Sequence, residues 1–384
     1  MMKCSYIVHA LVVSFVAVFS FASGNLSLAS DAPILLGCVG DFSGTYSTIG
    51  RDQKAGIEMA IDEINATGGV LNRKLKAVFE DCGAKPSLAA TKTEKLILHD
   101  KADCIIGSIS SGSTLAMMKI AEKYKVLMLA PISESTKITG EEKSKYVFRF
   151  PAHVFMTNFA LAKWMIENAG RRIYLLSVDY AWGRDSSAVY REGVKKFGGQ
   201  IVGETYFPLK TKDFAPYFGK IKSAHPDALL ITSAGNDAIS VLTQLNQYGL
   251  SKTMKFGGAG SMIAESNLQA LGDSAEGFVT VDYYAASLDN PANKKFRENY
   301  AQRFGREPSK FGVMSYETVK WLAKVIRETG SMDVEKLITC FEGSDFAGPQ
   351  GFKKIDKGSH QALLPVYLLT INNGKKVLVA QVSY

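Results

Sequence analysis

The sequence predicts an α/β protein with two lobes, each built on a parallel sheet. Three observations support this: short apolar strands alternate with amphipathic helices, the alternation restarts after Pro151, and the chain is long and apolar. With 384 residues, 46% of them hydrophobic, there is enough apolar surface for two packed cores. Such alternation is typical of parallel sheets covered by helices on both faces, with ligand sites at the carboxyl ends of the strands.

The first 29 residues are predicted to be a secretory signal. Lys3 supplies the positive charge, Tyr6–Ala22 form the apolar run, and no acidic residue precedes Asp31. Small residues at the positions that a signal peptidase reads allow cleavage after Ala22 or after Ala29, and we favour Ala29. No later stretch approaches 18 apolar residues, so we expect an exported, periplasmic protein without a membrane span.

The strands and helices follow in a regular order. The first strand is expected at Ile34–Val39, and the next helix carries Ala55, Ile57, Ala60, Ile61 and Ile64 at helical spacing before Gly68-Gly69. Seven further strands are predicted, with helices between them, at 75–79, 104–106, 126–129, 173–178, 201–207, 228–232 and 278–282.

The restart of the pattern divides the chain into lobes. Arg149-Phe150-Pro151 precede a helix at Val154–Ala169 and a second set of strands, which places the first boundary near residue 150. Helices at 291–304 and 311–328 are expected to return to the first lobe, and strands near 363–370 and 376–379 to the second. This predicts three crossings between a signal segment of 1–29, an N-terminal lobe of 30–150 plus about 283–347, and a C-terminal lobe of 151–282 plus about 348–384.

Charge and cysteine content exclude some classes of protein. The chain has 45 basic and 37 acidic residues, a net charge of +8, but basic pairs lie among acids and form no long run, so no nucleic-acid partner is expected. Cys4 stands too early for a lipid anchor. The remaining cysteines, Cys38, Cys82, Cys104 and Cys340, allow three full pairings and predict no specific bridge. Cys38 and Cys104 lie in or beside apolar strands, where burial is expected.

Catalytic and cofactor motifs are absent from the sequence. There is no phosphate-binding lysine loop, no H-E-x-x-H, no C-x-x-C, no G-x-S-x-G and no complete dinucleotide fingerprint. The histidines are scattered rather than spaced as metal ligands. We therefore expect no enzymatic activity, no cofactor and no metal.

One segment, 105–114, is suited to holding an anion. An apolar strand runs into a hydroxyl-rich turn and then into an amphipathic helix. A helix N-terminus leaves amide donors unpaired and carries a partial positive charge, so these amides and the Ser111 hydroxyl could hold a ligand carboxylate. Ordinary helix capping is the alternative, because serine and threonine are preferred caps of any helix.

Other candidate contacts lie in the loops that follow strands. Tyr180 and Trp182 could close over an apolar ligand body, although packing against a neighbouring helix is the alternative. The segments 233–236 and 257–261 are small and glycine-rich, which leaves room for a ligand. The complete candidate set is Tyr46, Ser110, Ser111, Ile132, Ser133, Glu134, Tyr180, Trp182, Ala234, Gly235 and Ala259.

Several of these motifs also carry a resemblance to a known family. They are Asp41-Phe42-Ser43-Gly44 with Gly50, the helix segment Gly56–Val70 with its Ile-Asp-Glu-Ile-Asn-Ala-Thr-Gly-Gly-Val ending, Ile106-Gly107 with Ser111, and Tyr180-Ala181-Trp182-Gly183. On these residues the chain resembles the periplasmic leucine/isoleucine/valine-binding protein family. The resemblance implies the type I periplasmic binding protein fold, which has two Rossmann-like lobes, three hinge crossings and a ligand trapped between the lobes.

The resemblance also has implications for the site. In amino-acid-binding members, the serine at the position of Ser111 helps to hold the ligand carboxylate. The acidic residue that holds the ligand ammonium is replaced here by Ala259, and a small hydroxyl residue is replaced by Glu134. Either Glu134 takes over the ammonium, or the ligand has no amino group, and we favour the second alternative.

The function implied is that of an extracytoplasmic binding protein of an ABC importer. Its ligand would be a branched-chain or other amino acid, or an aromatic or aliphatic carboxylate, and its partner a membrane permease. We expect it to act as a monomer. A periplasmic sensor that presents its ligand to a membrane signalling receptor is one alternative, and an exported hydrolase is a weaker one.

Overall fold

The first half of the structure contains a five-stranded parallel sheet. The structure is a computed structural model that describes residues 32–383 apart from the side chain of Ser266. The predicted signal segment and both cleavage sites lie outside these residues. The order in the sheet is β2-β1-β3-β4-β5. The strands are β1 (Ile34–Gly40), β2 (Leu75–Asp81), β3 (Cys104–Ile106), β4 (Met128–Ala130) and β5 (Val147–Arg149).

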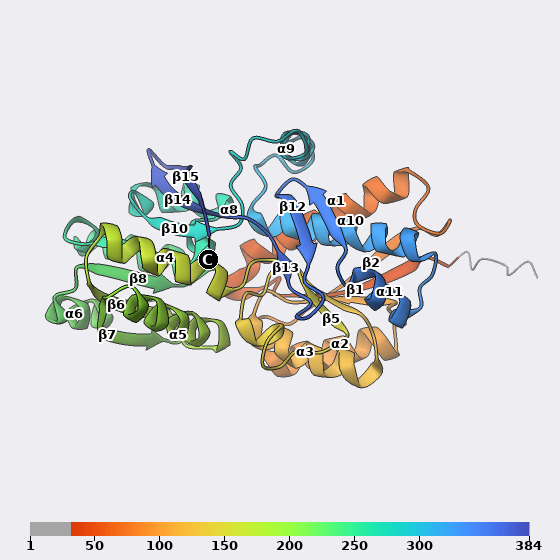
Figure 1. The fold of residues 1–384 in the computed structure, drawn as a ribbon, viewed down its shortest axis with the longest axis horizontal. Coiled ribbons are helices and arrows are strands. Elements are labelled where there is room, and N and C mark those ends of the chain that lie inside the picture. Colours follow the sequence, from red (N-terminus) through yellow and green to blue (C-terminus); the bar gives the residue numbers. More distant parts are fainter. Residues whose placement is uncertain (1–31, 384) are drawn as a thin grey trace, which may run out of the picture. The chain divides into compact units, whose positions relative to one another are not determined.

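Helices cover both faces of this first sheet. Leu36 and Cys38 of β1 pack in one core with α1 (Ser47–Ala66) and α10 (Lys310–Thr329), while Val39 packs with α2 (Pro86–Leu98) and α3 (Ser111–Tyr124). Helices α1 and α10 lie side by side (Figure 1) because Gly56 has no Cβ, which would stand 2.1 Å from the carbonyl oxygen of Gly312. The close contact brings a late segment of the chain back to the first sheet.

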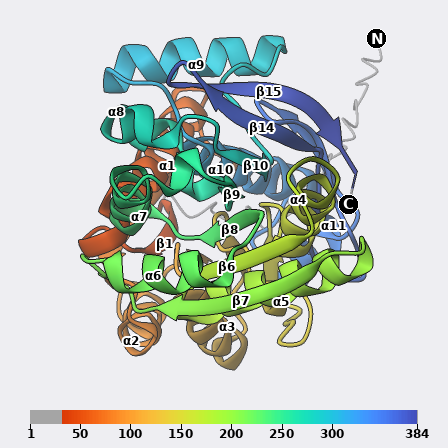
Figure 2. The ribbon, with the colours of Figure 1, turned by 90° about the vertical axis from the view of Figure 1, so that its left-hand side faces the viewer.

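A seven-stranded sheet forms the second half of the structure. Its order is β15-β14-β10-β9-β8-β6-β7, and Figure 2 shows β7 at one edge and β15 at the other. Neighbouring strands run parallel from β7 to β10, whereas β14 is antiparallel to β10 and β15 is antiparallel to β14. The strands are β6 (Arg172–Val178), β7 (Gln200–Phe207), β8 (Ala228–Thr232), β9 (Lys255–Gly258), β10 (Val279–Asp282), β14 (Val366–Asn372) and β15 (Lys375–Val382).

The second sheet is also covered on two faces. Ile173 and Leu175 of β6 share a core with α4 and α5, while Leu176 and Val178 face α6 and α7. Side chains alternate along a strand, so one short apolar strand supplies both cores. The helices are α4 (Val154–Asn168), α5 (Ala181–Lys196), α6 (Ala215–Ala224), α7 (Gly235–Gln247) and α8 (Glu265–Leu271).

A three-stranded antiparallel sheet at residues 345–363 was not predicted. It consists of β11 (Asp345–Gly348), β12 (Gly351–Ile355) and β13 (Ala362–Leu363), preceded by α9 (Pro291–Phe304) and α11 (Val334–Phe341). The side chain of Lys353 on β12 is fully buried, where its ammonium contacts Glu317 and donates to Gln350 at 2.8 Å. A buried lysine interrupts the apolar pattern by which such a strand is recognised.

Two further strands differ from the prediction. Strand β5 has three residues, too few to show a period. Gly257 and Gly258 lie in β9, although the sequence places them in a loop. A Cβ on Gly258 would stand 1.8 Å from the carbonyl oxygen of Ile231 in β8, so glycine allows the two strands to pair here.

The cysteines of the described chain, Cys38, Cys82, Cys104 and Cys340, are free thiols. Cys38 and Cys104 are buried in β1 and β3. Within residues 32–383, no helix combines the length and the apolar character needed to cross a membrane.

Candidate functional site

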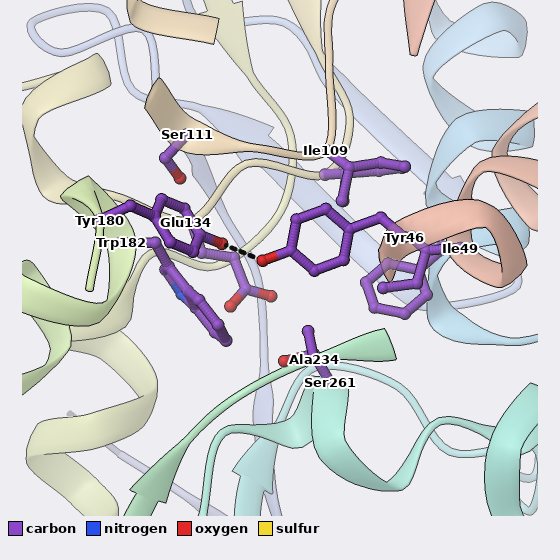
Figure 3. Close-up of a pocket in the computed structure, with 11 residues that line it drawn as sticks. Tyr46, Ile49, Ile109, Ser111, Glu134, Tyr180, Trp182, Ala234 and Ser261 are labelled. Carbon is purple, nitrogen blue, oxygen red and sulfur yellow. Dashed lines mark hydrogen bonds between the residues drawn. The ribbon is translucent and has the colours of Figure 1, made fainter. Parts of the chain in front are cut away.

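A small cavity of about 20 Å³ lies where strands of both sheets end (Figure 3). In this arrangement the lining side chains leave room for little more than one water molecule, so they must move apart to admit a solute. The side that follows the first sheet, here called the first wall, consists of Tyr46, Ile49, Ile109, Ser111, Ile132, Glu134 and Phe311. The side that follows the second sheet, the second wall, consists of Tyr180, Trp182, Ala234 and Ser261.

The two walls meet because of the order of the strands. Tyr46 ends a short 3-10 helix, Gly44–Tyr46, directly after β1, and Ser111 and Glu134 follow β3 and β4. Tyr180 and Ala234 occupy the same position after β6 and β8. The carboxyl ends of parallel strands meet at one edge of a sheet, and the two sheets turn these edges toward the same cavity.

Buried Asp41 fixes the turn between β3 and α3. Its Oδ2 accepts hydrogen bonds from the amides of Ile109 (3.2 Å) and Ser110 (2.9 Å) and from the hydroxyl of Ser108 (3.0 Å). Its Oδ1 accepts from the amide of Ala84 at 2.6 Å. The turn is therefore held in place by the protein itself, without a contribution from a ligand.

Ser111, the first residue of α3, turns its hydroxyl toward the cavity (Figure 3). The oxygen accepts a hydrogen bond from the backbone amide of Ser135 at 3.3 Å, which leaves the hydroxyl proton free to be donated. The first turn of α3 adds a partial positive charge. This corner of the cavity is therefore suited to an anionic group.

The second wall is aromatic and has small residues beside the rings. The rings of Tyr180 and Trp182 are 6.1 Å apart, and the ring of Tyr46 on the first wall is 6.5 Å from that of Tyr180. Within residues 32–383, the indole N–H of Trp182 is buried without a hydrogen-bond partner. Ala234 and Ser261 leave space next to these rings, so the second wall can cover a flat or apolar ligand body.

Three contacts join the two sides around the cavity. The Tyr46 hydroxyl donates to the Tyr180 hydroxyl at 2.9 Å (Figure 3), and the Asp185 carboxylate on α5 accepts from the amide (2.5 Å) and hydroxyl (2.8 Å) of Thr136. Gly235 packs against the backbone of Thr45, where a Cβ would stand 2.1 Å from the carbonyl oxygen. The two sides thus touch beside the cavity.

Among the described residues that line the cavity, Glu134 is the one charged side chain. Its Oε1 accepts from the Lys310 ammonium at 2.9 Å and from the Tyr283 hydroxyl at 3.1 Å. Burial raises the pKa of Glu134 above its ordinary value, although Lys310 acts in the opposite direction. Glu134 is therefore already bonded within the protein.

Four of the sequence candidates do not line the cavity. The amide of Ser110 is bonded to Asp41, and the hydroxyl of Ser133 donates to the carbonyl of Ser108 at 2.8 Å. Gly235 contacts the opposite side of the molecule, as described above. Ala259 is buried after β9, and its amide donates to the carbonyl of Ile231 at 3.0 Å.

Four lining residues were missed by the sequence analysis: Ile49, Ile109, Ser261 and Phe311. Ile109 and Ser261 lie within the motifs that were singled out, so their position in those loops was a usable signal. Ile49 and Phe311 lie on α1 and α10, and Phe311 reaches the cavity only because these two helices pack together. No local sequence pattern predicts the packing of α1 against α10.

Comparisons with known proteins agree with this architecture. Residues 33–376 match the model of a periplasmic binding protein family. The Leu/Ile/Val-binding protein homolog 6 of Brucella melitensis is 26% identical over 364 residues, which cover 93% of this chain and 92% of that protein.

Solved structures are similar over nearly the whole chain. A solute binding protein of an ABC transporter from Rhodopseudomonas palustris, in complex with 3,4-dihydroxybenzoic acid, is 25% identical with a TM-score of 0.85, covering 92% of this chain and 98% of that one. A leucine-binding protein from Thermotoga maritima is 26% identical with a TM-score of 0.83, covering 91% and 99%. The predicted resemblance and fold class are confirmed: the chain belongs to the periplasmic binding protein family and has its two-lobed type I α/β fold.

Proposed function

We propose that this protein is the substrate-binding component of an ABC importer and captures a small carboxylate-bearing solute in the periplasm. It then presents the closed, loaded form to a membrane permease, acting as a monomer and without changing the solute chemically. The observation that carries the proposal is the cavity with one wall from each sheet. The ABC-transporter solute binding protein with bound 3,4-dihydroxybenzoic acid supports it.

Each wall has a separate part in the proposed binding. Ser111 and the first amides of α3 hold the carboxylate, because they combine a free hydroxyl proton with the positive end of a helix. Tyr180 and Trp182 cover the apolar body of the solute. Tyr46 and Ile132 also line the cavity, and they set the shape that the solute must have.

Closure follows from differential affinity. A solute that touches both walls stabilises the closed arrangement more than an open one, and it shifts the population by that difference. The Tyr46–Tyr180 and Thr136–Asp185 contacts form only when the two sides meet, so they add to the closed state. A permease can distinguish the two states by shape.

The division into lobes is part of this proposal. The expected N-terminal lobe comprises 30–150 plus about 283–347, and the expected C-terminal lobe 151–282 plus about 348–384. Within residues 345–363, the ring of Phe346 stacks on that of Trp321 of α10, with the ring centroids 5.5 Å apart. Gln361 forms a β-bridge with Arg149 of β5. These contacts favour extending the N-terminal lobe to about residue 363, with the third crossing just before β14.

A thermal-shift screen tests the binding role. Protein purified from the periplasm is screened against amino acids, aromatic carboxylates, branched keto acids and small amides. A ligand at 100 times its dissociation constant adds about 2.7 kcal/mol to the free energy of unfolding, which raises the melting temperature by roughly 2–10 °C. We expect such a shift with a carboxylate, and no shift with any of these classes would contradict the proposal.

The importer role needs a second test. A strain that lacks this gene is expected to lose uptake of the radiolabelled screening hit at low external concentration, and a plasmid copy restores it. Unchanged uptake would contradict the importer role while leaving the binding role intact.

A further inference from the structure

A chain of five buried charged side chains runs from the first wall into the second half of the structure. Glu134 is bonded to Lys310, Lys310 to Asp282 at 2.9 Å, Asp282 to Lys376 at 3.4 Å, and Lys376 lies 3.5 Å from Glu265. Signs alternate along this chain, and every one of the side chains is at most 9% exposed. We call it the buried charge chain.

Lys310 is the member that matters to a ligand. Its ammonium lies between two carboxylates, Glu134 and Asp282, each 2.9 Å away, and only 1% of its side chain is exposed. It does not line the cavity itself, but it is bonded to the one charged residue that does. Tyr283 adds a second donor to the same Glu134 oxygen, at 3.1 Å.

We propose, on the basis of the proposed function, that Lys310 is a specificity-determining residue, which occupies Glu134 and thereby restricts the cavity to carboxylates that have no amino group. An ammonium enclosed in a dry cavity needs an unpaired carboxylate to offset its desolvation. The first wall has no such group, and the second wall has no acidic residue among its described members.

The groups around Glu134 reinforce this. Fully buried Arg149 of β5 is directed at neutral oxygens, those of Ser135, Thr139 and Gln361, so its positive charge is not cancelled by a bonded carboxylate. Burial lowers the pKa of Arg149 to about 9, although the negative charges of Asp185 and Glu134 offset part of this effect. A ligand ammonium would approach a carboxylate that is already bonded to Lys310 and interacts electrostatically with Arg149.

The protonation directions agree with the geometry. Burial lowers the pKa of Lys310, but Asp282 and Glu134 outweigh burial and raise it, so Lys310 stays charged. Burial raises the pKa of Glu134, while Lys310 acts to lower it. The contacts of Glu134 with Lys310 and Tyr283 therefore leave no unpaired carboxylate for a ligand ammonium.

The test uses pairs of ligands that differ only in the amino group: 4-methylpentanoate against L-leucine, and 3-phenylpropanoate against L-phenylalanine. Calorimetry on the wild-type protein is expected to give at least about tenfold tighter binding of an amine-free member. In Lys310→Met, Glu134 loses its cation, and the affinity ratio is expected to move toward the amino acid by about tenfold or more. The amino acid should also raise the melting temperature of this variant.

Lys376→Met is the matched control. It removes the second ammonium of the buried charge chain, which lies 3.4 Å from Asp282 and does not contact Glu134. It is expected to lower stability while leaving the affinity ratio at the wild-type value. Lys310→Arg keeps a cation beside Glu134 and should also keep the wild-type ratio.

The outcomes separate this inference from the proposed function. Tighter binding of an amino acid than of its amine-free partner by the wild-type protein would overturn the role of Lys310 and leave the binding function standing. A ratio that moves equally in Lys310→Met and Lys376→Met would also overturn it. Failure of every carboxylate to bind would overturn both. If Lys310→Met does not fold, Glu134→Gln decides: a loss of amino-acid binding there would identify Glu134 as an ammonium partner.

Discussion

The two walls of the cavity differ in how much of their bonding is already complete. On the first wall, Ser111 accepts from Ser135, Glu134 is bonded to Lys310 and Tyr283, and Asp41 fixes the turn behind them. On the second wall, aromatic rings and small side chains dominate, and the Trp182 N–H has no partner within the described chain. The first wall is therefore prepared for a fixed charged group, whereas the second wall is suited to the varied body of a ligand.

Trp182→Ala tests the second wall and is expected to have the largest effect. Trp182 is 4% exposed and is, with Tyr180, one of the two aromatic residues of that wall. Loss of a buried aromatic contact costs about 2–4 kcal/mol, so affinity for the screening hit should fall roughly 30- to 1,000-fold in calorimetry. Trp182→Phe keeps a ring and should lose much less. Equal losses in both variants would contradict the covering role.

Ser111→Ala tests the first wall. The substitution removes a hydrogen bond to a charged group, worth about 1.5–3 kcal/mol, so we expect a roughly 10- to 150-fold weaker affinity. Ser113→Ala is the control, because Ser113 lies in the same helical turn, does not line the cavity and has a buried hydroxyl without a partner in residues 32–383. Similar affinities for the two variants would remove Ser111 from the site.

Tyr46→Phe tests the contact between the walls. Its hydroxyl bond to Tyr180 joins the two walls, so in the proposed closure its loss should weaken binding by about 0.5–1.5 kcal/mol, roughly 2- to 13-fold. Tyr174→Phe is the control, since it removes a hydroxyl bond of 2.6 Å to Thr205 inside the second sheet. The control should lower the melting temperature without changing affinity, and a comparable affinity loss would argue against closure.

Glu265→Gln tests the end of the buried charge chain that lies away from the cavity. Burial raises the pKa of Glu265 above 4.5, with Lys376 acting in the opposite direction. The folded protein then binds this proton more tightly than the unfolded chain, so the free energy of unfolding falls as the pH rises from 4.5 through the folded-state pKa. Denaturant titrations across this range should show a flatter pH dependence in the variant. An unchanged slope would show that Glu265 does not contribute.

The sequence determined the regular parts of the fold. Strands such as Cys104–Ile106 and Ala228–Thr232 were predicted at their observed bounds, because buried parallel strands are continuous apolar runs between helices of clear period. The same logic placed Tyr46, Ser111, Glu134, Tyr180 and Trp182 at strand ends, where the cavity lies. Their roles in binding remain predictions.

Tertiary structure decided what lies between distant segments. Phe311 reaches the cavity, and Lys310 reaches Glu134, through the packing of α10 against α1, across more than 170 residues of sequence. Lys353 and Glu317 meet in the same way beneath β12. Local periodicity reports which face of an element is apolar, but the partner of a buried charge depends on how elements pack. The sequence therefore left open whether Glu134 holds a ligand ammonium or the ligand has no amino group. The position of Lys310 favours a ligand without an amino group.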